Sequence, residues 1–284
     1  MPEPEQLRTE KTLKRISLRK AERLTFTAVD DLAFAAERGR LQGKPATSVF
    51  VPAEIGPLIE LAKLSANGPL PPVKANPWIV LDAYSAFYNA MTSGRNQWFC
   101  PDGHKLGFIR TTWDPAGDDT QWTAFLVEAQ RIAEANGFPK MIAAQLMGAI
   151  GELQSNIYEH SEAARTGLIA FQATQRHFEF VVSDKGIGIL ASLRSCPDYA
   201  SLNDHGEALS CALQDGNSRH GIAARRGMGF RQLFIGLANL NGALRFRSGN
   251  HTLTIDGRSP TLMTAKLAQK PHIRGFVASV SCSL

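Results

Sequence analysis

Long apolar runs are missing from this sequence of 284 residues. None of its runs is long enough to cross a bilayer, since a membrane-spanning helix needs about 20 predominantly apolar residues. The amino terminus is charged and lacks the apolar centre of a secretory signal peptide. We therefore expect a cytoplasmic protein with no membrane partner.

Cysteine is scarce as well. The four cysteines, Cys100, Cys196, Cys211 and Cys282, are scattered without the spacing of metal ligands. Cys100 and His104 would supply two zinc ligands, but no second pair follows them. The simplest interpretation is a set of reduced thiols in the cytoplasm.

Neither sign of charge dominates the chain. Lys and Arg number 31 against 26 Asp and Glu, which gives a formal net charge of +5. Basic residues gather near the amino end, where Glu3, Glu5, Glu10 and Glu22 dilute them. This mixture is typical of a solvated helix or tail, so a nucleic-acid partner is not expected.

The pattern of elements divides the chain into two parts. Residues 1–104 give weak mixed α/β signals, including a charged helix over residues 5–22 and a buried strand over residues 78–81, but no catalytic constellation. We expect a regulatory or partner-binding module there. Residues 105–284 predict helices that cover one face of an antiparallel sheet, which is a two-layer α/β sandwich. Its expected strands are residues 106–112, 167–173, 177–183, 243–247, 252–255 and 275–281.

The helix that ends near residue 160 carries two stripes. Residues four apart lie on one helical face, so Glu152, Asn156 and His160 form a polar stripe. A neighbouring apolar stripe with the same period is expected to face the core. It consists of Ile142, Leu146, Ala149, Leu153 and Ile157. One helix thus buries one side and presents a carboxylate and an amide at the edge of that buried surface.

Two glycine motifs follow this helix in the sequence. The first, Asp184-Lys185-Gly186-Ile187-Gly188, comes directly after an expected strand. The second, Arg226-Gly227-Met228-Gly229, opens an expected helix after a long excursion. Each motif alone is a weak signal, because two glycines near an acid usually form a simple turn.

The three motifs in this order resemble the Bergerat-fold ATP-binding family, the GHKL group. That group includes gyrase-type ATPases, heat-shock chaperones, mismatch-repair ATPases and histidine kinases. The resemblance covers roughly residues 105–284 and implies a mixed, mostly antiparallel sheet with helices on one face. It implies ATP and Mg²⁺ as cofactors.

The resemblance also implies a role for each residue of the first motif. Asp184 would accept a hydrogen bond from the adenine amine. Gly186 and Gly188 would let the backbone turn and approach the base, where a Cβ would collide. The segment between the two glycine motifs would form a mobile lid.

On the helix, the resemblance assigns Asn156 as the ligand that gives an oxygen to Mg²⁺. Glu152, one turn earlier, would be the general base that accepts a proton from water or from a protein hydroxyl. His160 matches a position of the family's motif and is counted among the nucleotide-binding residues.

The second glycine motif would hold the phosphates. Gly227, Met228 and Gly229 would present backbone N–H groups and a helix amino end. Arg225 and Arg226 would add charge-assisted contacts.

Among the branches of this group, the anti-sigma-factor serine/threonine kinases are the most similar. The similarity lies in the helix pair over residues 122–160, in its Glu159-His160 ending and in the second glycine motif. Histidine kinases usually have a lysine where this chain has Glu159. One departure concerns adenine binding, because a Gly-Thr expected before the final strand is Gly275-Phe276 here.

These observations lead to two main hypotheses of function. The first is an ATP- and Mg²⁺-dependent serine/threonine protein kinase or ATPase that acts as a switch in bacterial-type signalling on a protein partner. The second is a nucleotide-gated binding module without catalysis, in which residues 1–104 capture the partner. A nucleic-acid-linked ATPase is the least favoured alternative, and a homodimer is compatible with all three.

Overall fold

A computed structural model of the chain describes residues 20–41, 48–68, 70–101, 105–112, 119–213, 242–255 and 265–284. The chain divides by its contacts into two units, one up to Ser85 and one from Ala86 onward. The sequence pattern predicts a division after residue 104. The two boundaries differ because a short strand, β3 (Gln97–Phe99), pairs with β4 (Leu106–Arg110) and thereby joins the second unit.

The first unit is built on a pair of parallel strands, β1 (Lys20–Leu24) and β2 (Ser48–Pro52). Helix α2 (Phe26–Glu37) connects them, and α3 (Ile55–Asn67) follows β2 and packs against α2. Thr25 caps the start of α2, because its hydroxyl accepts a hydrogen bond from the Ala28 N–H over 3.2 Å, as preferred at helix starts.

One expectation for this unit was wrong at its end and another was wrong as a whole. The charged helix expected over residues 5–22 falls mainly on residues 1–19, which lie outside the described part. Its last three residues, 20–22, belong to strand β1, which ends at the fully buried Leu24. The buried strand expected over residues 78–81 is a single bridge between Ile79 and Phe50, and these residues are only half-buried. A short apolar run does not by itself supply the neighbouring strand that a buried strand requires.

The second unit contains a six-stranded sheet in the order β3-β4-β5-β6-β8-β7. Its further strands are β5 (Leu168–Thr174), β6 (His177–Asp184), β7 (Ala243–Ile255) and β8 (Lys266–Ser283). All adjacent strands described in this sheet are antiparallel. The two separate strands expected between residues 243 and 255 form one strand, β7, which continues through a bulge at Gly249.

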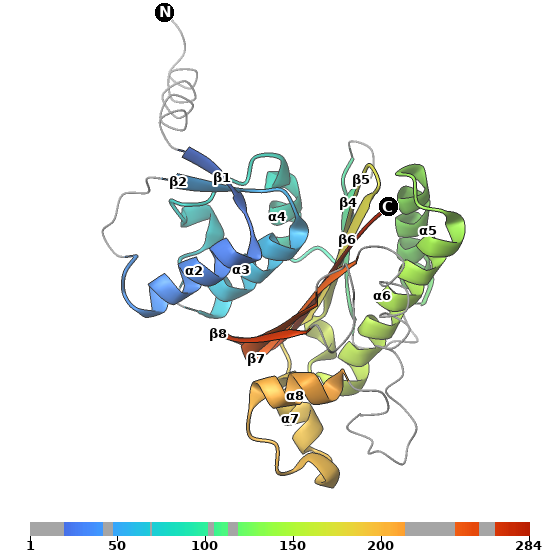
Figure 1. Cartoon of the computed structure of the whole chain (residues 1–284). Coiled ribbons are helices and arrows are strands. Elements are labelled where there is room, and N and C mark those ends of the chain that lie inside the picture. The colour runs from blue at the N-terminus through green and yellow to red at the C-terminus, as the bar shows by residue number, and fades with distance from the viewer. Residues whose placement is uncertain are drawn as a thin grey trace, which may run out of the picture. The chain divides into compact units, whose positions relative to one another are not determined.

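Helices α5 (Asp119–Ala135) and α6 (Lys140–His160) pack together on one face of this sheet (Figure 1). Gly137 ends α5 with a φ of +101°, and its N–H donates to the Glu134 carbonyl oxygen over 3.0 Å. This stop at residues 136–137 confirms the prediction from the sequence. The unit is therefore an α/β structure with one helical layer against the sheet.

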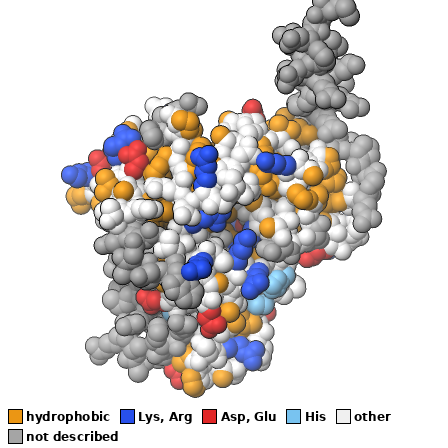
Figure 2. Space-filling model, turned by 180° about the vertical axis from the view of Figure 1, so that it is seen from behind, with side chains coloured by type: hydrophobic (Ala, Val, Ile, Leu, Met, Phe, Trp, Pro, Cys, Tyr) orange, Lys and Arg blue, Asp and Glu red, His pale blue; other side chains and the backbone are white. Residues whose placement is uncertain are grey.

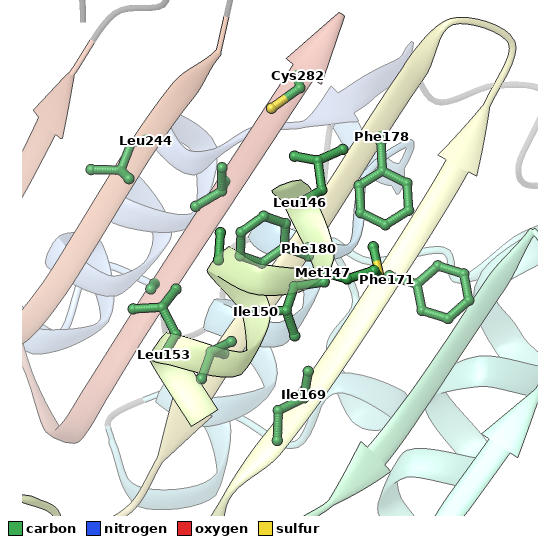
Figure 3. Packing of buried hydrophobic residues seen from close by; sticks show 14 of the residues in the cluster. Leu146, Met147, Ile150, Leu153, Ile169, Phe171, Phe178, Phe180, Leu244 and Cys282 are labelled. Carbon is green, nitrogen blue, oxygen red and sulfur yellow. The ribbon is translucent and has the colours of Figure 1, made fainter. Parts of the chain in front are cut away.

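The core lies between α6 and the sheet. Leu146, Met147, Ile150 and Leu153 of α6 face the aromatic side chains of β5 and β6 (Figure 3). The apolar stripe predicted on this helix is confirmed, because four of its five members are buried and Ile142 packs against the same cluster. Each fully buried side chain of this size contributes roughly 1.5–3 kcal/mol.

Two short helices follow β6 and pack against β7 and β8 (Figure 1). They are α7 (Gly188–Arg194) and α8 (His205–Ala212). Asp204 caps α8 by accepting hydrogen bonds from the Gly206 and Glu207 N–H groups over 2.7 and 2.9 Å.

The remaining short elements are α4 (Ser85–Thr92) and the 3₁₀ turns η1 (Val73–Ala75), η2 (Asp82–Tyr84), η3 (Ala164–Thr166) and η4 (Pro197–Tyr199). Among the residues described, no helix combines the length and apolar character that crossing a membrane demands.

Candidate functional site

The first glycine motif forms a tight turn at the end of β6. Asp184 is the last residue of that strand and is only 4% exposed. Its Oδ1 accepts a hydrogen bond from the Gly186 N–H over 2.7 Å. Gly188 then takes a φ of +78°, which favours glycine, and opens α7. The carboxylate of Asp184 thus stands at the strand end where the sequence analysis expected it.

The end of α6 holds this turn from one side. The Ile187 N–H donates to the carbonyl oxygen of Ser161, the residue after α6, over 3.0 Å. The Lys185 N–H donates to the Thr166 hydroxyl over 2.9 Å. A Cβ on Gly186 would overlap the Ser161 carbonyl oxygen. Glycine is therefore required at position 186 by the protein's own packing, a reason that the sequence analysis did not anticipate.

Strands β7 and β8 hold the turn from the other side. The Ser248 hydroxyl accepts a hydrogen bond from the Ile189 N–H over 3.0 Å and donates to the Gly275 carbonyl oxygen over 2.9 Å. Gly275 has a φ of +75°, and a Cβ there would lie 2.6 Å from Asp184 Oδ1. Asp184 is also the register partner of Phe276 on the neighbouring strand.

Gly275 therefore lies against Asp184, at the position where the family resemblance expects its Gly-Thr. The side chain of the following Phe276 stacks on Phe246 at a centroid distance of 5.6 Å within the core. The structure thus brings Gly275 to the motif and uses residue 276 for packing. Ser161 and Ser248 were missed by the sequence analysis, because single serines after a helix and inside a strand carry no distinguishing spacing.

The polar stripe of α6 leads toward this turn. Glu152 is exposed, whereas Asn156 and His160 are half-buried. Because a helix rises 1.5 Å per residue, Asn156 lies about 8 Å and Glu152 about 14 Å before Ser161 along the axis. His160 Nε2 lies 4.0 Å from the neighbouring Glu159 carboxylate. The stripe and the turn are thus joined through the carboxyl end of a single helix.

The second glycine motif is outside the described residues, and so are all the phosphate-binding residues predicted on it. They are Arg225, Arg226, Gly227, Met228 and Gly229. Helices α7 and α8 belong to the segment between the two glycine motifs, which the resemblance designates as a lid. What the structure brings together is Asp184 with Gly186, Gly188 and Gly275.

Two hollows border other parts of the chain. An open depression of about 520 Å³ lies beside α2 in the first unit and is lined by residues such as Arg23, Thr25 and Asp31. A cavity of about 20 Å³ lies beside Gln154 and Tyr158 of α6, on a flank away from the polar stripe. Ligand pockets usually span about 300–1,000 Å³, so the second hollow is too small for a nucleotide. None of the predicted site residues that the structure describes lines either of them.

The chemical character of the donor groups fits a nucleotide with Mg²⁺ in two respects. A buried carboxylate at a strand end offers an acceptor to an exocyclic amine, and an amide such as Asn156 offers an oxygen to a hard cation that keeps phosphate and water ligands. The described part of the chain contains no group of three or more His, Cys, Asp or Glu residues that would hold a metal by itself. Such a cluster is not needed where phosphates supply the other ligands.

Comparison with known proteins gave two findings. No protein-family model matches this chain. A search of curated proteins found no match either. The interpretation of the site therefore depends on its residues and on the arrangement of the elements that carry them.

Proposed function

We propose that the second unit binds ATP with Mg²⁺ and that the protein acts as a regulatory switch of the GHKL type, as a serine/threonine protein kinase or an ATPase. The observation that supports this most is the position of Asp184. It is a buried carboxylate in a glycine turn that is held between the end of α6 and Gly275. The order of helix, turn and strands is the one that the family resemblance implies.

In this proposal each residue has one task. Asp184 selects adenine by accepting a hydrogen bond from its amine, and Gly186, Gly188 and Gly275 keep the turn tight beside it. Asn156 orients the cation, and bound ATP with Mg²⁺ supplies the transferable phosphoryl group. Glu152, exposed on α6, takes a proton from the attacking hydroxyl or water. Arg225, Arg226, Gly227, Met228 and Gly229 would contact the phosphates.

Nucleotide binding is tested first, by isothermal titration with a non-hydrolysable ATP analogue in the presence and absence of Mg²⁺. Asp184→Asn keeps an oxygen that accepts from the Gly186 N–H but replaces the second acceptor with a donor. Loss of a hydrogen bond to a charged group costs about 1.5–3 kcal/mol, so affinity should fall roughly 10- to 100-fold. Asp198→Asn makes the same change on an exposed residue and serves as the control. Equal affinity of the two variants would remove Asp184 from the site.

Turnover is tested separately with Glu152→Gln. This variant should lose phosphate release or phosphoryl transfer while it retains nucleotide affinity, because a general base acts only on the reacting proton. Glu128→Gln on α5 is the matched control. Full turnover in Glu152→Gln would show that this carboxylate is not the base.

The alternative is a nucleotide-gated binding module without catalysis. The folding of the first unit around its own parallel strands favours it, since a separate module has a surface of its own to offer a partner. In that case ATP would bind without phosphate release, and partner capture would depend on nucleotide.

A further inference from the structure

Strand β8 is longer than the part of it that pairs with β6, so among the described strands its first residues have a neighbour, β7, on one side only. Its pairing with β6 ends where Phe276 meets Asp184. Earlier in the strand, residues 266–269 pair with residues 251–254 of β7. On their other side, the described residues provide no strand, and all four residues from Lys266 to Gln269 are exposed. Backbone donors and acceptors on such an open side are a template for another strand.

The ribbon formed by β7 and β8 carries charge of one sign only. Its described residues, 242–255 and 265–284, contain five Lys or Arg residues and no Asp or Glu. Arg245 and Arg247 are buried. Lys266, His272 and Arg274 are exposed, and Lys270 is half-buried. The exposed part of the ribbon is therefore a basic surface.

Among the described residues, neighbouring elements offset only part of this charge. Helix α8 packs on the ribbon and brings His205, whose ring lies 6.0 Å from that of His272. It also brings the carboxylates of Asp204 and Glu207; the hydrogen bonds that Asp204 accepts at the start of α8 lower the pKa of its carboxyl group, so it keeps its negative charge. Figure 2 shows histidine atoms directly beside Lys or Arg side chains on one face of the molecule. Among the described residues around the open side of β8, the three Lys and Arg side chains thus outnumber the two carboxylates.

An exposed apolar side chain accompanies the charges. Leu267 is 46% exposed and belongs to the small number of large apolar residues on the described surface. It lies within the open stretch, next to Lys266. A partner that pairs with this stretch would cover Leu267 as well as the backbone groups.

We propose that residues 266–269 of β8, together with the basic side chains of Lys266, Lys270, His272 and Arg274, bind an extended acidic segment of a partner protein by strand addition. In this mode main-chain hydrogen bonds give affinity, and alternate side chains give specificity. Lysine on an open strand repels other basic edges and discourages non-specific pairing. An acidic segment gains from the same charges, so the lysines select the partner.

The proposal does not depend on nucleotide binding, because none of these residues belongs to the site around Asp184. It is tested on the full chain without nucleotide, by fluorescence anisotropy. The probe is a labelled 10-residue peptide of alternating Glu and Thr. We expect saturable binding that weakens as salt is raised from about 50 to 500 mM, because exposed charges are screened. A peptide of alternating Gln and Thr should bind at least about tenfold more weakly.

Charge reversal on the protein locates the surface. The double variant Lys266→Glu, Arg274→Glu turns two attractions into repulsions and should weaken binding about tenfold or more. Lys140→Glu, at an exposed position at the start of α6, reverses a distant charge and should leave binding unchanged. Circular dichroism of each variant checks that the fold is retained.

Strand addition is separated from simple charge attraction through the peptide. Two further Glu-Thr peptides carry N-methyl groups on one or the other alternate set of residues, which removes the main-chain donors of that set. One of them should bind at least about tenfold more weakly than the parent, since only one set of donors faces the protein. Equal binding of all three peptides would refute strand addition.

Other outcomes also overturn the proposal. No binding of the Glu-Thr peptide up to about 1 mM would do so, as would equal loss in Lys140→Glu and in the double variant. Oligodeoxythymidylate of ten nucleotides is tested in parallel. If it binds through Lys266 and Arg274 while the acidic peptide does not, the surface recognises nucleic acid and not protein.

Discussion

Replacing Gly275 by alanine perturbs the candidate site at a crowded point. Two costs follow from the structure. The φ of +75° is unfavourable for a residue with a Cβ by about 1–2 kcal/mol. In addition, the new Cβ would lie 2.6 Å from Asp184 Oδ1 and 2.8 Å from the Gly186 nitrogen, which are closer than real contacts.

These two atoms are partners in the buried hydrogen bond that closes the turn. If they separate, a buried polar group loses its partner, which costs about 1–3 kcal/mol. Together with the backbone term, Gly275→Ala should lower the free energy of unfolding of the second unit by about 2–5 kcal/mol.

Gly94→Ala is the matched control. Gly94 belongs to the same unit and has a φ of +79°, but a Cβ there would meet no atom within 4 Å. It should therefore show only the backbone cost of about 1–2 kcal/mol. Urea unfolding followed by tryptophan fluorescence gives both values, and hydrogen exchange of peptides that cover residues 177–194 shows whether the turn opens. Losses that agree within about 0.5 kcal/mol for the two variants would refute the crowding argument.

Three further predictions concern other parts of the second unit. Burial, followed by the nearby His272 and His251, lowers the pKa of His205 below its usual 6.5. The unfolded chain therefore binds a proton at His205 more readily than the folded chain does, so the docking of α8 should weaken as pH falls below about 6.5. Hydrogen exchange of the α8 amides, measured from pH 8 to pH 5, checks this. The exchange rates should depend less on pH in His205→Gln. Burial raises the pKa of Cys282 to about 12, so roughly one Cys282 thiol in 10⁴ is ionised at pH 8. Iodoacetamide should therefore modify the half-buried Cys100 and spare Cys282, which peptide mass spectrometry would show. Phe180→Ala removes a fully buried ring and should cost about 3–5 kcal/mol in urea unfolding, and a loss below about 1 kcal/mol would contradict the described core.

The helices and strands of the second unit were largely predictable from the sequence. The period of apolar residues on α6 identified its buried face, and the glycine at position 137 marked the end of α5. These signals are local, because they depend on residues within one or two turns of each other. The bounds of β5 and β6 were likewise predicted within one residue.

The strand predictions that were wrong concern pairing between residues far apart in the sequence. Residues 78–81 have the composition of a strand, but their pairing is a single bridge between Ile79 and Phe50, made by the backbone hydrogen bonds of Trp78 and Val80 to Phe50. The break expected between residues 247 and 252 is a bulge, because β8 supplies partners on both sides of Gly249. Pairing of this kind involves residues far apart in the sequence, which periodicity within a single segment does not report.

In the candidate site, too, the local signals were predictable from the sequence and the long-range contacts were not. Asp184 and its glycines were identified from their spacing, whereas the groups that fix them, Ser161 and Ser248, lie 23 and 64 residues away in the sequence. The glycines were attributed to space for a ligand. The structure gives a different reason, since Gly186 and Gly275 make room for the backbone of other elements.

The place of β8 inside the sheet has a consequence for how the unit is made. Within the described sheet, strand β7 is joined to the other strands only through β8, which comes later in the sequence. During synthesis, β7 has no strand of this sheet to pair with until β8 has left the ribosome. The hairpin of β5 and β6 forms earlier, because its residues are close together in the sequence. Assembly of this unit should therefore end with the insertion of β8, the step at which a slow or aggregation-prone intermediate is expected.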